Sequence, residues 1–277
     1  MANKKSIRNI FLAVAAIFLT VASFAGCDKD GKESADSKNE TSGGAGPGRK
    51  TDGPGAAERE AGIAALEKKD HEEAMKKFRA GAEKGDPDAM LLYAICLDRD
   101  YGTGEKDDAA VEEWLKKAAE TGDPLAQAHY GNFLMEHRKK SEGLAYLRKS
   151  ADGGSAFGQF TFGMACMDEG DYAKGLANLK KAASQPLTDK KSVLDYVDDV
   201  RSYKEWSDFP FELDDEHLTN ANLAVVMSQV MLGLAYHAGV ATGGRDLNEA
   251  KKWLEMARDN GCREIDEWLE ELEKENK

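Results

Sequence analysis

The side chains best suited to bind a metal are five histidines, and their spacing matches no known set of ligands. The sequence contains neither a His-Glu-x-x-His stretch nor Cys and His residues at zinc-site spacing. His129 and His137 stand eight residues apart, about two helical turns, which is too far for one helix to offer both to a single ion. We therefore expect no metal and no cofactor, and surface or packing roles for the histidines: His71, His129, His137, His217 and His237.

Catalytic arrangements are equally sparse. The stretch that begins at Asp98 has carboxylates at the spacing that opens a calcium loop, but Thr103 replaces the glycine at position six and Ala109 replaces the glutamate at position twelve. The sequence has no P-loop, no nucleophile elbow and no Ser-x-x-Lys motif. We therefore predict no catalytic residues and no enzyme activity.

The N-terminus is a region of its own. Basic residues in MANKKSIRN precede the apolar run IFLAVAAIFLTVASFAG, which is shorter than a comfortable membrane span and ends at Cys27. The end of this run, Phe24-Ala25-Gly26-Cys27, resembles a bacterial lipoprotein signal, with Phe24 where that family usually has Leu. The resemblance implies a signal peptide over 1–26 and a lipid on Cys27. The alternative is an uncleaved signal-anchor helix.

The residues after Cys27 predict a tether. Asp28 resembles the inner-membrane retention signal of some Gram-negative bacteria, which implies the periplasmic face of the inner membrane. Residues 27–56 are rich in Gly, Ser, Asp, Lys and Pro and nearly devoid of apolar side chains, so they cannot bury enough surface to fold. We predict a disordered tether with an r.m.s. reach of about 30 Å.

From residue 57 onward the apolar pattern is helical and recurs. One recurring stretch ends a helix with an apolar residue, small residues and usually Gly, as in LKKAAETG at 115–122 and LRKSADGG at 147–154. A second stretch, such as AQAHYGNFL at 126–134, has an aromatic residue or Leu followed by Ala or Gly. Between the two stands a joint, Gly122-Asp123-Pro124, in which Asp123 is placed to cap a helix that begins at Pro124.

These stretches resemble the Sel1-like repeat family, which is related to tetratricopeptide repeats. The C-terminal copy carries the family pattern in SQVMLGLAY, a Gly-rich loop, AKKWLEMA and Gly261, and Trp114 with KKAAETG carries part of it earlier. The resemblance covers most of 57–261. It implies an all-α fold, an α-solenoid of about five helix-turn-helix repeats in a right-handed superhelix.

Two parts of the chain depart from the repeat. The interval at about 188–222 is acidic and aromatic and has no copy of the pattern, so it is either a decayed repeat whose aromatic residues fill the stack or a lid beside a binding surface. After Gly261, Ile265, Trp268, Leu269 and Leu272 form one apolar stripe on a polar helix. We predict that 262–277 is a capping helix, because an open solenoid end would leave its last core face wet.

The family geometry implies that the first helix of each pair lines a concave groove. The residues that it would place there are unusually rich in Met and Phe, whose adaptable side chains suit peptide binding. The alternative is that they are core between repeats, the commoner role of apolar residues at helical spacing. The predicted groove residues are Leu91, Ile95, Leu125, Ala128, Asn132, Phe157, Phe160, Met164, Met167, Met227, Val230, Leu234 and His237.

The remaining cysteines do not have the spacing of a disulfide within one repeat. Cys96 and Cys166 would lie two repeats apart, roughly 20 Å, so we expect Cys96, Cys166 and Cys262 to be buried thiols.

The sequence as a whole predicts an interaction protein. The net charge of −13, with no basic cluster beyond the N-terminus, excludes nucleic acid as a partner. The leading prediction is a membrane-tethered extracytoplasmic scaffold of the bacterial cell envelope that binds a peptide or protein segment in the groove. The alternatives are a regulator of an envelope enzyme or sensor and, because some Sel1-like proteins are linked to that activity, a β-lactamase-like hydrolase.

Overall fold

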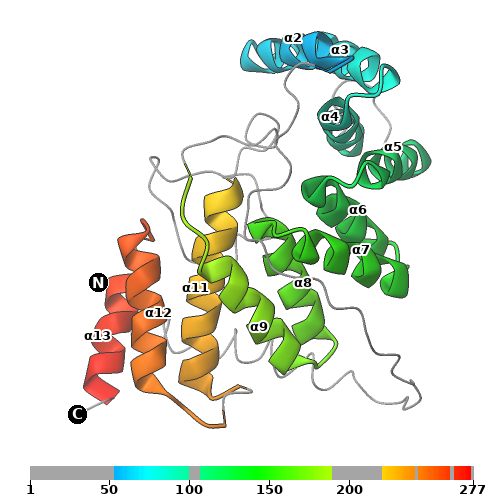
Figure 1. Ribbon diagram of the computed structural model, residues 1–277. Coiled ribbons are helices and arrows are strands. Elements are labelled where there is room, and N and C mark those ends of the chain that lie inside the picture. Colours follow the sequence, from blue (N-terminus) through cyan, green and yellow to red (C-terminus); the bar gives the residue numbers. More distant parts are fainter. Residues whose placement is uncertain (1–52, 100–106, 189–219, 241–242, 263–264, 276–277) are drawn as a thin grey trace.

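A computed structural model describes residues 53–99, 107–188, 220–240, 243–262 and 265–275. The predicted signal peptide, Cys27 and nearly all of the predicted tether lie outside these residues. The regular elements of the described part are α-helices, drawn in Figure 1. Their bounds are α2 Ala56–Glu67, α3 His71–Glu83, α4 Pro87–Asp98, α5 Asp108–Glu120, α6 Pro124–Glu136, α7 Lys140–Asp152, α8 Ala156–Asp168, α9 Tyr172–Ala183, α11 Asn220–Ala238, α12 Leu247–Asp259 and α13 Ile265–Glu275.

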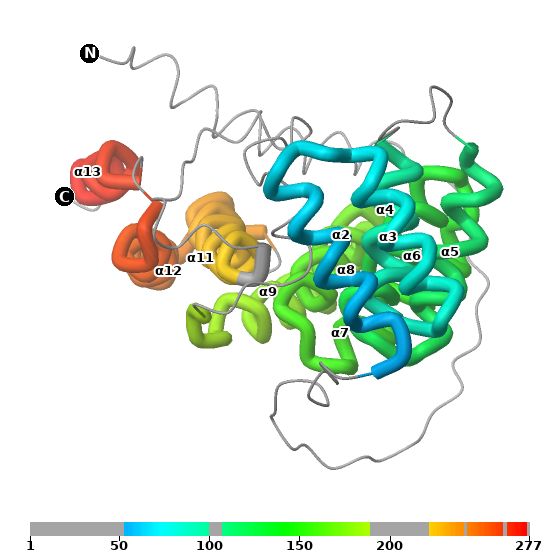
Figure 2. Tube along the Cα trace, turned by 90° about the horizontal axis from the view of Figure 1, so that it is seen from above, coloured from blue at the N-terminus to red at the C-terminus, as the bar shows by residue number. Residues whose placement is uncertain are grey.

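The helices pack as antiparallel pairs that follow one another through the molecule. The pairs are α2 with α3, α4 with α5, α6 with α7, α8 with α9, and α11 with α12. We call the first helix of each pair the A helix and the second the B helix. Figures 1 and 2 show that the pairs follow one another from α2 and α3 at one end of the stack to α13 at the other. This arrangement confirms the predicted all-α solenoid.

The joints between pairs form as the sequence predicts. The side chain of Asp123 accepts a hydrogen bond from the backbone N–H of Ala126 at 2.9 Å, and Pro124 takes the first helical position, where its missing N–H is harmless. Gly122 precedes them with φ +89°, a left-handed conformation that a residue with a Cβ adopts only with strain. The joint at Gly85 and Asp86 repeats this geometry. Each joint therefore turns the chain from one B helix into the next A helix.

A glycine in the A helix lets the two helices of a pair approach closely. A Cβ placed on Gly131 would lie 2.8 Å from Cδ2 of Leu147 in α7, inside van der Waals contact. Gly233 meets Leu254 of α12 in the same way, at 2.6 Å. The helical glycines of the repeat are therefore contacts between helices, in agreement with the sequence.

A and B helices differ in their neighbours. Successive A helices pack on one another, as α8 does on α6 and α11 does on α8, and each B helix packs on its own A helix and on the next one. No pair of B helices is among the closely packed pairs of described helices. Neighbouring described B helices therefore meet only through their side chains, or are separated by a space.

The stack continues directly from α9 to α11. Helix α11 packs against both α8 and α9, as α8 packs against α6 and α7. The side chain of Asn222 holds the backbone of Thr188 at both polar groups: its Oδ1 accepts from the N–H at 2.8 Å and its Nδ2 donates to the carbonyl at 3.0 Å. The prediction for 188–222 falls mostly on residues 189–219, which lie outside the described part.

The last helix closes the core. Ile265, Trp268, Leu269 and Leu272 are all buried, and α13 packs on α12. These are the residues of the predicted stripe. The free face of α12 is thereby removed from water, and this is the role expected of a solenoid cap.

Candidate functional site

Most of the side chains predicted to line a groove are core residues. They are at most 7% exposed, so they cannot contact a partner in this conformation. An A helix packs on the A and B helices before and after it through apolar residues at helical spacing. The predicted groove residues occupy these packing positions. The prediction was wrong for Leu91, Ile95, Ala128, Phe160, Met167, Met227, Val230 and Leu234.

The contact made by Arg59 shows what one of these positions does. Arg59 stands three residues before Gly62, just as Phe160 stands three residues before Gly163. Its Nη1 donates to Oδ2 of Asp86 at 2.7 Å, and both side chains are buried. Because Asp86 caps the next A helix, this position faces the following repeat rather than a groove.

Four predicted groove residues remain partly accessible on two central A helices. Leu125 and Asn132 of α6 are half-buried, as are Phe157 and Met164 of α8. His129 joins them: its ring stacks on Phe157 with centroids 5.3 Å apart and planes 20° apart. We call His129, Asn132, Phe157 and Met164 the A-helix strip. Asn132, Phe157 and Met164 are predicted groove residues that the structure leaves partly accessible, and His129, which was not predicted to line the groove, is added because of its ring contact.

His237, the last predicted groove residue, belongs to the C-terminal end of the molecule. Its Nε2 lies 3.2 Å from Oε2 of Glu275 in α13, and Arg245 contacts both side chains. Burial lowers the pKa of His237 below its ordinary value of 6.5, against the opposing effect of Glu275. His237 therefore ties α11 to α13, and the groove prediction does not hold for it.

The described part of the chain offers no constellation for metal binding, because no three His, Cys, Asp or Glu side chains there lie close enough to hold an ion. His137 instead ends α6: its Nδ1 lies 2.8 Å from the carbonyl of Phe133, and its Nε2 lies 3.4 Å from Asp108. The Phe133 carbonyl and then Asp108 raise the pKa of His137, since both favour the charged ring.

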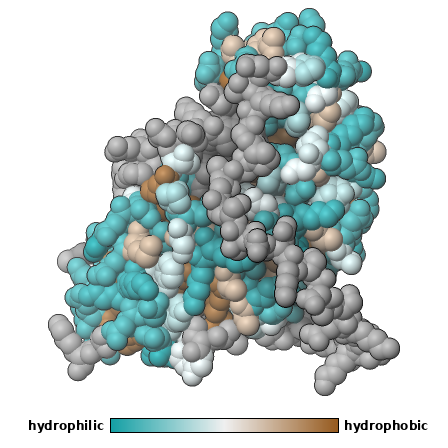
Figure 3. Space-filling view, in the orientation of Figure 1, coloured by the Kyte–Doolittle hydropathy of each residue, from teal (hydrophilic) through white to brown (hydrophobic). Residues whose placement is uncertain are grey.

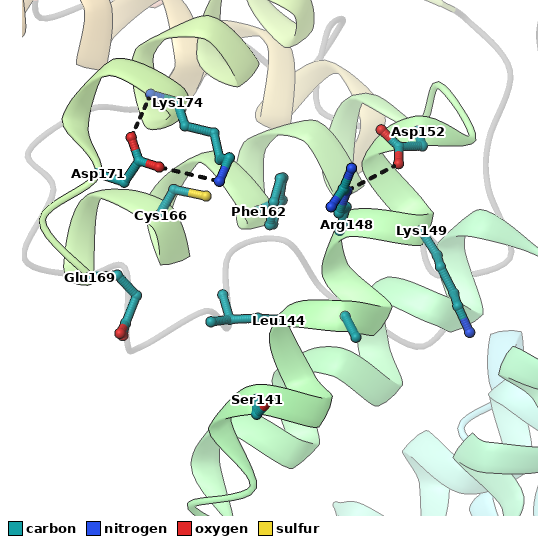
Figure 4. Close-up of a pocket in the computed structure, with 11 residues that line it drawn as sticks. Ser141, Leu144, Arg148, Lys149, Asp152, Phe162, Cys166, Glu169, Asp171 and Lys174 are labelled. Atoms are coloured by element: carbon teal, nitrogen blue, oxygen red, sulfur yellow. Dashed lines mark hydrogen bonds and ion pairs between the residues drawn. The ribbon is translucent and has the colours of Figure 1, made fainter. Parts of the chain in front are cut away.

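An open cleft of about 610 Å³ lies on the B-helix side of the stack, between α7 and the corner where α8 turns into α9 (Figure 4). Helix α7 contributes a continuous stripe that runs from Ser141 to Asp152. Phe162 and Cys166 of α8 form its apolar floor, between that stripe and the α9 end of the cleft. The cleft is lined by Ser141, Leu144, Ala145, Arg148, Lys149, Asp152, Phe162, Cys166, Glu169, Asp171 and Lys174.

The rim of the cleft is charged, and its acidic side chains are all paired with basic ones. Asp152 lies 3.6 Å from Nε of Arg148, Asp171 lies 3.2 Å from Nζ of Lys174, and Glu169 pairs with Lys140 of α7. Such a site can hold an apolar group over its floor and anionic groups at its rim. Reaction chemistry is not evident, because burial raises the pKa of the Cys166 thiol to about 11 and keeps it protonated at neutral pH.

The comparisons with known proteins point to one repeat family. The Sel1 repeat model matches residues 87–123, 125–155, 164–187 and 226–262. Four stretches of the chain therefore resemble the Sel1 repeat. The first helix pair, α2 and α3, lies outside the matched residues although it stacks like the others. No curated protein sequence matches the chain.

Two solved structures share the fold. A Sel1 repeat protein from Oxalobacter formigenes is 19% identical with a TM-score of 0.53, and the alignment covers 75% of this chain and 73% of that one. A protective antigen of uropathogenic Escherichia coli strains, which displays an SLR (Sel1-like repeat) fold, is 20% identical with a TM-score of 0.53. That alignment covers 80% of this chain but only 42% of the antigen. Together with the repeat matches, these neighbours support a Sel1-like repeat protein.

The tryptophan position of the Sel1 repeats is not aromatic in the helix pair beside the cleft. Trp114 of α5 meets Tyr93 edge to face, with ring centroids 5.5 Å apart, and Tyr146 of α7 meets Tyr130 at 4.7 Å. Trp114 and Tyr146 each stand directly before a Leu of their B helix. The residue at the same place in α9 is Asn178. Phe162 therefore lacks the ring contact that its equivalents have, within the described residues. The cleft lies beside this ring, between α7 and the corner where α8 turns into α9.

Sequence reasoning missed this cleft because it assigned binding to the A helices alone. The signal was the break in the aromatic column, where Asn178 follows Trp114 and Tyr146. The cysteines behave as predicted: Cys96, Cys166 and Cys262 are buried thiols. No helix in the described part is long and apolar enough to cross a membrane.

Proposed function

We propose that this protein is a lipid-anchored scaffold of the bacterial cell envelope that captures a segment of a partner protein on the A-helix strip. Sel1 repeat proteins generally mediate protein–protein interaction and are typically non-catalytic. The similarity to distant structures supports the fold alone, so the evidence for a binding site is the exposure of the strip residues themselves.

The proposal rests on one position of the repeat, at which the side chains of different A helices differ in exposure. Ile95 and Leu234, in α4 and α11, are buried by their neighbours, whereas Asn132 and Met164 at the equivalent places in α6 and α8 are half-buried. The stack therefore leaves this one position of its central A helices partly accessible. The visible described surface in Figure 3 is mostly hydrophilic with small apolar areas, so a short segment is a better occupant than a large hydrophobic face.

The anchor follows from the N-terminal sequence. A lipid on Cys27 would hold one end, and residues 28–56 would let the repeats reach about 30 Å from the membrane. Asp28 favours the periplasmic face of the inner membrane. Mass spectrometry of the exported protein should find Cys27 as an acylated N-terminus, and an intact Met1 end would rule the anchor out.

The strip is tested by site-specific crosslinking in the native envelope. A photo-crosslinking residue at Met164 or Asn132 should capture one protein band, and the same residue at exposed Ala64 of α2 should not. Phe157→Asp should remove the band while the helical CD signal stays unchanged, with Ala64→Asp as the matched control. A band that survives Phe157→Asp and Met164→Asp in folded protein would place the partner elsewhere.

A further inference from the structure

We propose that the cleft between α7 and α9 is a second binding site, and that it receives an aromatic side chain carried by an acidic segment of a partner protein. The ring would contact Phe162, for which Asn178 of α9 supplies no aromatic partner. This site lies on the B helices and is separate from the A-helix strip.

Aromatic pairs recur along the stack and stop at Phe162. Tyr93 and Tyr130 each have an aromatic partner at the equivalent place in their B helices, Trp114 and Tyr146, with interplanar angles of 78° and 71°. Edge-to-face contact is a favoured geometry for aromatic pairs. Phe162 presents the same kind of ring from α8, but Asn178 donates its amide to the carbonyl of Lys174 in its own helix at 2.9 Å. The repeat thus supplies one half of an aromatic pair, and a ligand can supply the other.

Lysines recur at one position of the B helices. Lys117 lies 4.1 Å from the centroid of the Trp114 ring and Lys149 lies 4.6 Å from that of Tyr146, three residues after each ring. Lys181 has the same position in α9, three residues after Asn178, so no ring of its own helix lies beneath it. A ring bound over Phe162 would restore the cation–π contact that the other repeats have.

The two helices beside the cleft are basic. Helices α7 and α9 hold six basic side chains against only Glu142 and Asp152, in a chain whose net charge is −13. The acidic groups of the rim are already paired, and Lys149 and Lys181 have no acidic partner among the described residues. Acidic residues beside the bound ring would therefore be favoured over basic ones, and binding would weaken as salt rises.

The size of the cleft sets the length of the segment. The α7 stripe from Ser141 to Asp152 covers eleven helical steps, or roughly 16 Å. An extended chain covers that distance in about five residues. The occupant is accordingly a short extended segment with one central aromatic residue and acidic neighbours.

The test combines a peptide-binding measurement with variants whose side chains would fill the cleft. Full-length protein is titrated into a fluorescein-labelled pentapeptide that has Trp at its centre and Asp or Glu elsewhere, and binding is followed by fluorescence anisotropy. We expect binding at least tenfold tighter than that of the same peptide with central Ala. Asn178→Trp, which supplies the missing ring, should weaken peptide binding at least tenfold, whereas Asn178→Ala should keep it. Lys181→Glu should weaken it, and Lys116→Glu on α5 is the matched control.

Independent variants keep the result interpretable. Ala145→Trp fills the cleft from α7 and should act like Asn178→Trp if the latter fails to fold. Phe157→Asp should leave peptide binding unchanged, which separates this site from the A-helix strip. Equal binding of the Trp and Ala peptides, or unchanged binding to a folded Asn178→Trp protein, would overturn the proposal. A dimer in sedimentation that Asn178→Trp dissociates would also overturn it, because the occupant would then be a second copy.

Discussion

Arg59 in α2 donates from Nη1 to Oδ2 of Asp86 at 2.7 Å, and this contact joins the first helix pair to the rest of the solenoid. Asp86 also accepts the N–H of Ala89 at 2.7 Å, and Asp88 lies 3.6 Å from Arg59. One carboxylate thus caps α4 and neutralises a buried guanidinium. The first pair, which the Sel1 repeat model does not match, is held to its neighbour by a charge rather than by the apolar contact at the same position in later repeats.

The first prediction concerns this pair. Asp86→Ala should lower the free energy of unfolding by about 3–5 kcal/mol, because it leaves Arg59 buried without its closest counter-charge. Asp70→Ala, which removes the exposed cap of α3, should cost only about 1 kcal/mol. Urea unfolding measures both, and amide hydrogen exchange should show the loss of protection concentrated in α2 and α3. Equal costs for the two variants would contradict a structural role for the ion pair.

A second prediction concerns the close approach of α6 and α7. Gly131→Ala places a methyl group 2.8 Å from the side chain of Leu147, so crowding of about 1–3 kcal/mol should outweigh the helix propensity gained, about 1 kcal/mol. Gly163→Ala meets its nearest atom at 3.1 Å and should cost less. Thermal unfolding gives the order. A more stable Gly131→Ala protein would show that the glycine is not required for packing.

His137 and His237 have pKa values shifted in opposite directions, so they should respond to pH in opposite directions. His137 has a raised pKa, so its contribution to stability is present below 6.5 and is lost as pH rises through the higher folded value. His237 has a lowered pKa, so stability is lost as pH falls through 6.5 toward the lower folded value.

NMR titration checks these directions. The ring proton signal of His137 should titrate above pH 6.5 and that of His237 below it. Removing Asp108 with Asp108→Asn should move the His137 titration to lower pH, because Asp108 favours the charged ring. A His237 titration above 6.5 would mean that Glu275 outweighs burial, opposite to the order found here.

The cysteines give a prediction about reactivity. Cys96, Cys166 and Cys262 are buried, and the raised pKa of Cys166, about 11, leaves little thiolate at pH 8. In a Cys27→Ala protein, Ellman's reagent should react slowly under native conditions and with three thiols after denaturation without reductant. Fewer than three would reveal a disulfide that forms between molecules.

Much of the architecture was predictable because its causes are local. The Gly-Asp-Pro joint specifies a left-handed residue, a cap and a first helical turn within three neighbouring positions, and it forms as predicted at Asp123. The stripe of α13 specifies a cap for the same reason, because its four apolar side chains leave no other face to bury. The helical glycines of the repeat, such as Gly131, also predicted the close contacts between helices.

The exposure of side chains was not predictable in this way. Phe157 and Phe160 lie on the same helix at helical spacing, and so do Met164 and Met167, yet one of each pair is half-buried and the other is buried. Helical spacing fixes which side of α8 a residue occupies, but the neighbouring helices fix how much of that side is covered. The sequence alone therefore determined the pairs, joints and cap. The tertiary structure decided which apolar residues meet solvent, and it formed the cleft beside Phe162 and Cys166, because both depend on how the helices pack against one another.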